Sequence, residues 1–283
     1  MKTHLNTLFV TLEGSYLRKD GAAVEVRHER ESKLRVPLHN LEAIVCFGYD
    51  TSASVSLMAG CSEAGVSLSF HSPSGKFLAA TRGFTSGNIL LRREQYRRAD
   101  DLKDSANLAR NIIAAKIANS RTVLLRAARD HGDKDPVGTT ALLTASDFLD
   151  HRLAMALRTD SLDSLRGIEG DAAAAYFSVF KHLVTVSDAG LSFTGRTRRP
   201  PRDPMNALLS FLYALLMSDC RSALESCGLD PQCGFLHRDR PGRPSLALDL
   251  MEEFRACMAD RTALTLINRR QITTADFKSE ESG

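Results

Sequence analysis

Short apolar segments separated by turns fill the first 82 residues of the chain. β-branched and aromatic side chains are frequent in them, which is typical of strands. We predict one helix at residues 52–64 and strands at residues 5–12, 23–27, 34–47 (interrupted by Pro37), 66–70 and 76–81. A turn at residues 72–75 joins the last two strands as a hairpin. The pattern predicts a small, β-sandwich-like domain at residues 1–82.

The pattern becomes helical after a glycine-bearing linker at residues 83–88. Apolar residues then recur at the spacing of one helix face. We predict helices at residues 90–98, 106–129, 140–158, 171–184, 204–226 and 246–258. The helix at 204–226 has the clearest bounds, because Asp203 and Pro204 suit its first turn and Gly228 suits its end. The predicted fold class is α+β, with a larger all-α domain at residues 89–283 after the β domain.

The composition is that of a folded, water-soluble chain. Of 283 residues, 43% are hydrophobic and 25% are charged, which excludes a disordered or collagen-like protein. The longest nearly apolar run, residues 207–217, is too short to span a bilayer, and the N-terminus lacks a signal-peptide pattern. We therefore expect a cytoplasmic protein without a membrane segment, with its six cysteines reduced.

Arginine dominates the basic residues. Only nine of the 37 are lysine, and the planar guanidinium of arginine suits bidentate contacts to phosphate. A GC-rich genome would produce the same bias. The candidate DNA contacts, which are otherwise parts of a solvated surface, are Arg196, Arg198, Arg199, Arg202 and Arg243. Because tryptophan is absent and aromatic residues make up 6%, we expect recognition of the backbone of duplex DNA rather than base stacking.

Candidate metal ligands lie between residues 234 and 255. On the predicted helix there, Asp249 and Glu252 are three positions apart and share a face, and His237 precedes them in a loop rich in arginine and proline. Carboxylates with an imidazole suit Mg²⁺ or Mn²⁺. The alternative is a solvated acidic helix face with a surface histidine.

A polar stripe follows the predicted helix at 204–226. Asn206, Ser210 and Tyr213 share one face of this otherwise apolar helix. In a buried helix these groups need partners, which a catalytic pocket or bound DNA would supply. The alternative is that this face meets water.

Six segments together resemble one protein family. They are GFLH, GRPSLALDLMEEFR, RGIEGDAAAAYF, RRPPRDPMNALLSFLYALL, LEGSYLRKDG and LEAIVCFG. The family is the CRISPR-associated integrase-endonuclease of spacer acquisition (the Cas-one family), and the similarity is greatest to its type I-C branch. Members of that branch usually continue with further helices, so the resemblance implies a helical domain truncated at its C-terminus.

The resemblance implies roles for individual residues. Glu169, His237 and Glu252 match the family's metal ligands, which implies Mg²⁺ or Mn²⁺ as the cofactor. Asp249 matches a neighbouring acid that supports the site, and Tyr213 matches a tyrosine near it. Glu169 also has a plainer explanation, since an acid in the first turn of a helix favours the helix dipole. Whether His237 is a general base as well as a ligand stays open.

The resemblance further implies a DNA integrase and endonuclease that inserts new spacers into a CRISPR array. A 3′-hydroxyl of the spacer would attack a phosphodiester of the repeat. The implied partners are double-stranded DNA, a second copy of the chain bound through the β domain, and a small ferredoxin-like Cas-two protein. Two alternatives are a stand-alone endonuclease for branched DNA and a non-catalytic DNA-binding scaffold.

Overall fold

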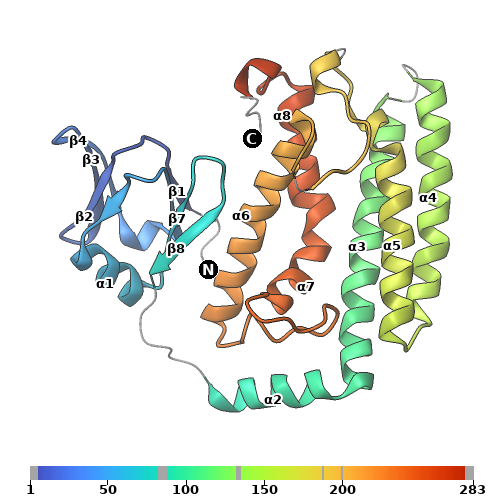
Figure 1. Ribbon diagram of the computed structural model, residues 1–283, viewed down its shortest axis with the longest axis horizontal. Coiled ribbons are helices and arrows are strands. Elements are labelled where there is room, and N and C mark those ends of the chain that lie inside the picture. The colour runs from blue at the N-terminus through green and yellow to red at the C-terminus, as the bar shows by residue number, and fades with distance from the viewer. Residues whose placement is uncertain (1–5, 82–87, 132–134, 187, 199, 278–283) are drawn as a thin grey trace. The chain divides into compact units, whose positions relative to one another are not determined.

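The computed structural model describes residues 6–81, 88–131, 135–186, 188–198 and 200–277. The chain divides into two compact units, one made of residues 1–88 with Ser226–Gly228 and the other of the remaining residues. Strands characterise the first unit and helices the second (Figure 1). The predicted α+β fold, with a β N-terminal region and a helical C-terminal region, is confirmed. The predicted linker at 83–88 lies almost entirely outside the described residues.

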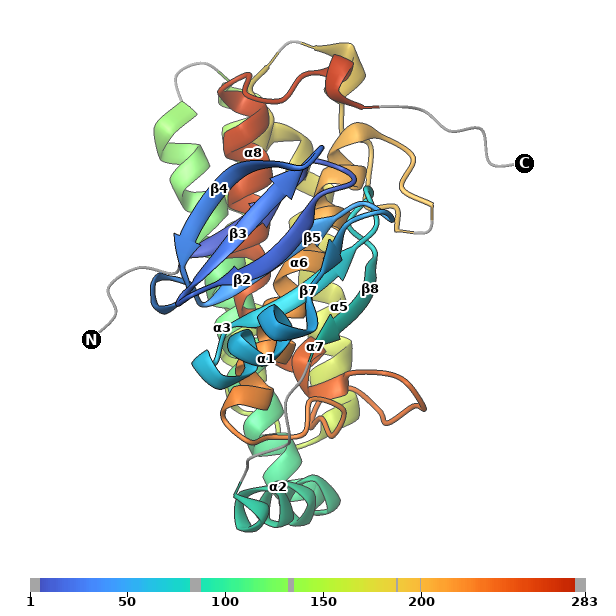
Figure 2. The ribbon, with the colours of Figure 1, turned by 90° about the vertical axis from the view of Figure 1, so that its left-hand side faces the viewer.

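Two four-stranded sheets form the N-terminal unit (Figure 2). In the first sheet, three parallel strands are followed by one antiparallel strand, in the order β1 (Thr7–Val10), β5 (Ala43–Phe47), β7 (Ser67–His71) and β8 (Phe77–Thr81). The second sheet has the order β4 (Glu31–Pro37), β3 (Ala23–His28), β2 (Tyr16–Asp20) and β6 (Ser52–Ala53). Helix α1 (Val55–Ala64) leads from β6 towards β7.

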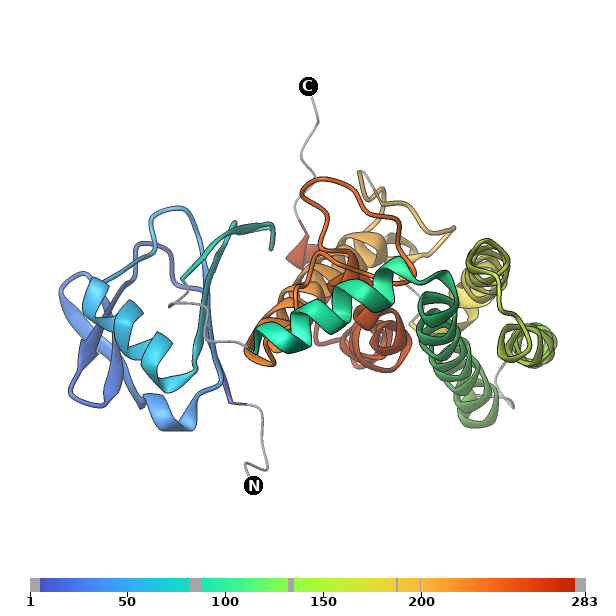
Figure 3. The ribbon, with the colours of Figure 1, turned by 90° about the horizontal axis from the view of Figure 1, so that it is seen from below.

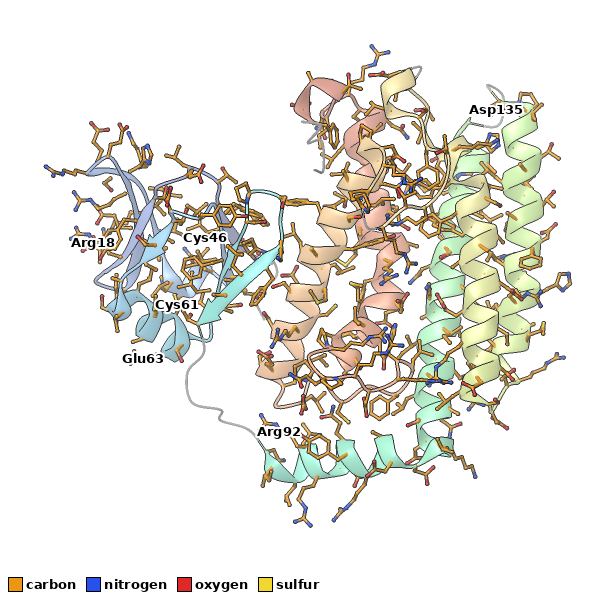
Figure 4. All side chains as sticks on the ribbon, viewed as in Figure 1. Arg18, Cys46, Cys61, Glu63, Arg92 and Asp135 are labelled. Atoms are coloured by element: carbon orange, nitrogen blue, oxygen red, sulfur yellow. The ribbon has the colours of Figure 1, made fainter. Side chains whose placement is uncertain are left out.

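Both sheets and α1 share one hydrophobic core. Ile44 and Leu68 of the first sheet belong to the same buried cluster as Leu17 of the second. Cys46 and Cys61, labelled in Figure 4, are buried in this cluster as free thiols. Burial raises the pKa of Cys46 to about 12 and that of Cys61 to about 11, so both stay protonated and unreactive.

The predicted strand at 34–47 is two strands in different sheets. Pro37 ends β4, the 3₁₀ turn η1 (Leu38–Asn40) follows, and β5 begins at Ala43. Proline cannot donate to a sheet ladder, so the chain leaves the sheet there. The sequence analysis missed β2 because its segment YLRKD buries only Leu17 and shows no hydrophobic alternation.

The described residues of the second unit form seven α-helices. They are α2 (Ile89–Asp100), α3 (Leu102–His131), α4 (Pro136–Leu157), α5 (Leu162–Val179), α6 (Pro204–Ser226), α7 (Ser245–Phe254) and α8 (Arg261–Asn268). The 3₁₀ turns η2 (Phe180–Leu183), η3 (Ala189–Leu191) and η5 (Thr274–Asp276) lie between or after them. Helices α3, α4 and α5 pack together around buried Ile113, Leu149 and Leu165, and Figure 3 views them nearly end-on.

Local signals explain most helix bounds. Asp135 (Figure 4) caps α4 by accepting a hydrogen bond from the backbone of Gly138, and Pro136 follows it. Helix α6 has the predicted bounds. Helix α5 begins nine residues before the predicted start at residue 171. After α7 the chain continues through the π-helical turn η4 (Arg255–Asp260) into α8, which the sequence analysis did not predict.

Helix α6 is relevant to the expectation that the chain has no membrane segment. By length and composition alone, α6 is the one helix among the described residues that could cross a membrane, which is weak evidence. Its side chains Met205, Leu209 and Leu216 are buried in the hydrophobic cores of the helical unit. This burial accounts for part of the apolar character of α6.

Candidate active site

Side chains from two helices and one loop meet in a single cavity beside α3. Helix α3 packs against both α5 and α7 and lies between them in Figure 1. Glu169 comes from α5, Glu252 from α7, and His237 from the loop that precedes α7. All three line one cavity of about 330 Å³. The three predicted metal ligands therefore line one cavity.

Glu169 lies in the interior of α5. The helix begins at Leu162 after the cap residue Ser161, and the acid in its first turn is Asp163. The alternative explanation of Glu169 as an acid in a first helical turn is therefore wrong. Its carboxylate instead faces the cavity.

Asp249 holds the loop that carries His237. Its Oδ2 accepts hydrogen bonds from the backbone N–H groups of Phe235 (2.6 Å) and Leu236 (2.9 Å), and its Oδ1 accepts one from the backbone of His237 (3.0 Å). The imidazole Nδ1 of His237 also donates to Oδ1, at 2.6 Å. In the neutral imidazole this hydrogen bond leaves the lone pair on Nε2, and carboxylates commonly orient metal-binding histidines in this way.

The loop packs so closely on α7 that residue 234 must be glycine. A Cβ atom at Gly234 would lie 2.7 Å from Cβ of Ser245 and 2.8 Å from Oδ2 of Asp249. The acids of α7 are correspondingly buried, with exposed fractions of 0% for Asp249 and 4% for Glu252. The alternative of a solvated acidic helix face is therefore wrong.

An ammonium group lies between the two glutamates. Nζ of Lys116, on α3, forms ion pairs with Oε1 of Glu169 and with Oε2 of Glu252, the latter at 2.6 Å. Nη2 of Arg255 lies 3.2 Å from the other oxygen of Glu252. Burial alone would raise the pKa of Glu252, but the positive charges of Lys116 and Arg255 outweigh it and lower this pKa. Glu252 is thus an anion although it is buried.

The donor atoms fit a hard divalent cation. Within the described ranges, no three His, Cys, Asp or Glu side chains stand close enough together to hold an ion, and Lys116 pairs with both glutamates. Oε2 of Glu252 is buried and lacks a hydrogen bond of good geometry. Two carboxylates and one imidazole match the preferences of Mg²⁺ and Mn²⁺. The three side chains therefore match such an ion by the type of their donor atoms, and Lys116 lies between the two carboxylates.

Arginines surround the same cavity. They are Arg166, Arg238, Arg240 and Arg243. Nε of Arg166 donates to the carbonyl oxygen of Leu236 at 2.8 Å and so ties α5 to the loop that carries His237. Guanidinium groups around an anionic centre are suited to binding the phosphates of a substrate that would bridge to a metal.

Tyr213 is outside this cavity. Its hydroxyl donates to Oδ1 of Asp260 at 2.6 Å, and the hydroxyl of Tyr176 donates to Oδ2 at 3.1 Å. The guanidinium of Arg255 lies 4.9 Å from the centre of the Tyr213 ring. Burial raises the pKa of Asp260 to about 6 against the opposing effect of these hydroxyls and charges. All four residues line a smaller cavity of about 30 Å³, which Lys116 also lines.

The polar stripe on α6 binds the arginine-rich segment before it. Nη1 of Arg196 donates to Oδ1 of Asn206 at 2.8 Å, and its Nη2 donates to the hydroxyl of Ser210 at 3.3 Å. Nδ2 of Asn206 donates to the carbonyl oxygen of Gly195 at 2.7 Å. The stripe therefore finds its partners within the protein, and not in water.

The arginines predicted to contact DNA lie in different environments. Arg196 is held by α6, and Arg243 lines the larger cavity. Arg198 lines the smaller cavity and is exposed, as is Arg202. Arg199 lies outside the described residues.

Comparison with known proteins identifies the family to which the chain belongs. The family described as CRISPR associated protein Cas1 matches residues 8–283. The chain belongs to the Cas1 family. It is 51% identical to CRISPR-associated endonuclease Cas1 1 of Chlorobaculum tepidum over 283 residues, 100% of this chain and 82% of that protein. It is 49% identical to CRISPR-associated endonuclease Cas1 2 of Rhodospirillum rubrum, with the same coverage of 100% and 82%.

Solved Cas1 structures share the fold. A Cas1 protein from Thermotoga maritima matches with a TM-score of 0.81 and 25% identity, over 99% of this chain and 84% of that one. A chain of a Cas6-RT-Cas1–Cas2 complex matches with a TM-score of 0.79 and 25% identity, over 100% of this chain and 30% of that one. Both likenesses extend over the β unit and the helical unit.

Sequence analysis missed three residues that shape this Cas1 site, namely Lys116, Arg166 and Asp260. Arg166 could have been found, because it precedes Glu169 by three positions and shares its helix face. Lys116 gave a weaker signal, as a lysine beside the buried Ile117 in an apolar stretch of α3. Its pairing with residues far along the chain depends on the tertiary fold.

Proposed function

We propose that this Cas1 protein is a metal-dependent DNA integrase and endonuclease that inserts new spacers into a CRISPR array. In integration, the oxygen of a spacer 3′-hydroxyl attacks a phosphorus of the repeat. A new phosphodiester forms as the old P–O bond breaks, and the leaving oxygen gains a proton. The observation that carries the proposal is the convergence of Glu169, His237 and Glu252 in one cavity lined by arginines.

In this mechanism Glu169, Nε2 of His237 and Glu252 would hold Mg²⁺ or Mn²⁺. Such an ion would supply Lewis-acid polarisation of the phosphoryl group and stabilisation of the leaving oxygen. Asp249 keeps the imidazole in the tautomer that exposes the Nε2 lone pair, so His237 acts as a ligand. Arg238, Arg240 and Arg243 orient the phosphates of the DNA.

The localisation, oligomeric state and partners that we propose are those that the family implies. We place the protein in the cytoplasm, in the type I-C branch, as a homodimer that uses its β unit for dimer contacts. It acts on double-stranded DNA together with Cas2. The likeness to a chain of a Cas6-RT-Cas1–Cas2 complex supports Cas2 as the partner.

A strand-transfer assay tests this function. The protein, with and without Cas2, is mixed with a short duplex bearing free 3′-hydroxyls and a supercoiled plasmid carrying a CRISPR repeat. Parallel reactions contain Mn²⁺ or EDTA and the variants Glu169→Gln and His237→Ala. Glu63→Gln serves as the control, because this acid is exposed on α1 (Figure 4).

The outcomes separate three functions. Joined DNA that requires the ion and both site residues, but not Glu63, supports the integrase. Nicking without joining would favour a stand-alone endonuclease. DNA binding without chemistry would favour a scaffold and contradict the proposed metal site.

A further inference from the structure

Lys116 occupies a position that the proposed function reserves for a metal ion. Its Nζ contacts Glu169 and lies 2.6 Å from Oε2 of Glu252. Divalent cations bind carboxylate oxygens at about 2.0–2.6 Å. An ion held by the same two oxygens would therefore fall almost on the position of the ammonium nitrogen.

The second carboxylate oxygen of Glu252, Oε1, offers no free position for the ion. Its Oε1 lies 3.2 Å from Nη2 of Arg255, so each oxygen of this carboxylate already faces a cation. Glu252 and Lys116 are also well buried, with side-chain exposures of 5% and 12%. A divalent ion added beside an undisplaced ammonium would be repelled strongly, because water screens so little there.

We infer that Lys116 is an internal counter-ion that competes with the divalent ion for Glu169 and Glu252, and so sets the metal affinity of the site. This inference rests on the proposed function. Without the ion, the single ammonium charge is shared by the two neighbouring carboxylates and links α3 to α5 and α7. When the ion binds, the ammonium leaves at least one carboxylate.

Once displaced, the side chain of Lys116 can enter a second cavity that it already lines. Lysine has a flexible four-carbon stem. Lys116 also lines the adjoining cavity of about 30 Å³, where the hydroxyl-bearing residues Ser120 and Tyr213 contribute to the wall. A cavity of that volume is large enough for one small polar group or a water molecule.

Calorimetric titration of the full-length protein with Mn²⁺ tests the inference. The variants are Lys116→Gln, which keeps a hydrogen-bond donor without the charge, and Lys116→Met, which removes both. Lys103→Gln is the matched control, because Lys103 is exposed near the start of the same helix. His237→Ala identifies the heat that belongs to the site. Melting temperatures are measured in EDTA and in Mn²⁺.

We expect Lys116→Gln to bind Mn²⁺ about tenfold more tightly or better, since a charge repelling the ion at close range is gone. Its melting temperature should fall in EDTA, and Mn²⁺ should raise that temperature more than it does in wild type. Lys103→Gln should match wild type. Lys116→Met should shift both quantities in the same direction, and Lys116→Gln gives the answer if the Met variant does not fold.

Two results would overturn the inference in distinguishable ways. Equal or weaker Mn²⁺ binding by folded Lys116→Gln, with wild-type binding that His237→Ala abolishes, would refute the counter-ion and leave the proposed function standing. Absence of His237-dependent binding in both wild type and Lys116→Gln would refute the counter-ion and the metal site together.

Discussion

Glu252 on α7 and Asp260 at the end of η4 are two buried acids, eight residues apart, whose pKa values shift in opposite directions. Both are almost inaccessible to solvent, with exposed fractions of 4% and 2%. Yet the pKa of Glu252 lies below its ordinary value, whereas that of Asp260 is raised to about 6. The difference lies in their partners, because Glu252 pairs directly with two cations and Asp260 accepts hydrogen bonds from two tyrosine hydroxyls.

The comparison shows that burial alone does not mark a metal ligand. Glu252 is kept ionised and lines the cavity with Glu169 and His237, as expected of an acid that binds a metal ion. Asp260 is the last residue of the π-helical turn, and its carboxylate accepts hydrogen bonds from Tyr213 and Tyr176. We therefore propose that Glu252 binds the metal ion and that Asp260 positions the two tyrosines.

The largest expected effect is that of Glu252→Gln. A neutral amide binds Mg²⁺ or Mn²⁺ less well than a carboxylate, so metal-dependent strand transfer should fall by more than the roughly 10- to 100-fold typical of losing an outer-shell partner. Initial rates of joining in Mn²⁺ measure this. Rates within a few-fold of wild type would erase the distinction between the two acids.

Asp249→Asn should have the next largest effect. One oxygen of Asp249 would become an NH₂ group that cannot accept hydrogen bonds, so either the backbone N–H groups of Phe235 and Leu236 or His237 would lose its acceptor. We expect Mn²⁺ affinity to fall roughly 10- to 100-fold, as for other outer-shell partners. Calorimetry measures the affinity, and an unchanged dissociation constant would show that Asp249 does not orient His237.

Asp260→Asn should change the pH dependence of stability. A carboxyl whose pKa rises from 3.8 unfolded to about 6 folded binds more protons in the native state between these values. Its contribution is therefore fully present below pH 3.8 and is lost as pH rises through about 6, a change on the order of 3 kcal/mol. Urea unfolding at several pH values should show a smaller loss of stability with rising pH in Asp260→Asn than in wild type. Parallel profiles would mean that folding does not raise the pKa of Asp260.

The smallest effects concern two glycines near the site. Gly234→Ala would push its Cβ against Ser245 and Asp249, and we expect about 1–3 kcal/mol of lost stability. Gly167→Ala is the control, because a Cβ there meets nothing within 4 Å and alanine favours the exposed interior of α5 by about 0.5–1 kcal/mol. Denaturant midpoints compare the two. Equal stability of both variants would contradict the tight packing of the loop on α7.

Local chemistry explains what the sequence could reveal. Asp203 and Gly228 bound α6 by capping and chain reversal, which act within a few residues. The start of α5 was missed although Leu165, Ile168 and Ala172 form a buried apolar stripe, because Gly167 and Gly170 between them are weak helix formers. Helix α8 offered a stripe of Ala263, Leu264 and Ile267 that could have predicted it.

The candidate site likewise combines residues that could be identified from the sequence with features that depend on the tertiary fold. Resemblance, and not spacing, singled out Glu169 as a partner of His237 and Glu252, which lie far along the chain. The burial of Asp249 and the place of Lys116 depend on how α3, α5 and α7 pack. Neither the burial of Asp249 nor the position of Lys116 can be predicted from the sequence of a single helix.

Anomalous diffraction from crystals grown with Mn²⁺ tests the central claim most directly. We predict a manganese peak bound by Glu169, Nε2 of His237 and Glu252, with Nζ of Lys116 moved away from at least one of the two glutamates. A manganese peak elsewhere, or none in this cavity while Lys116 still pairs with both carboxylates, would contradict the account.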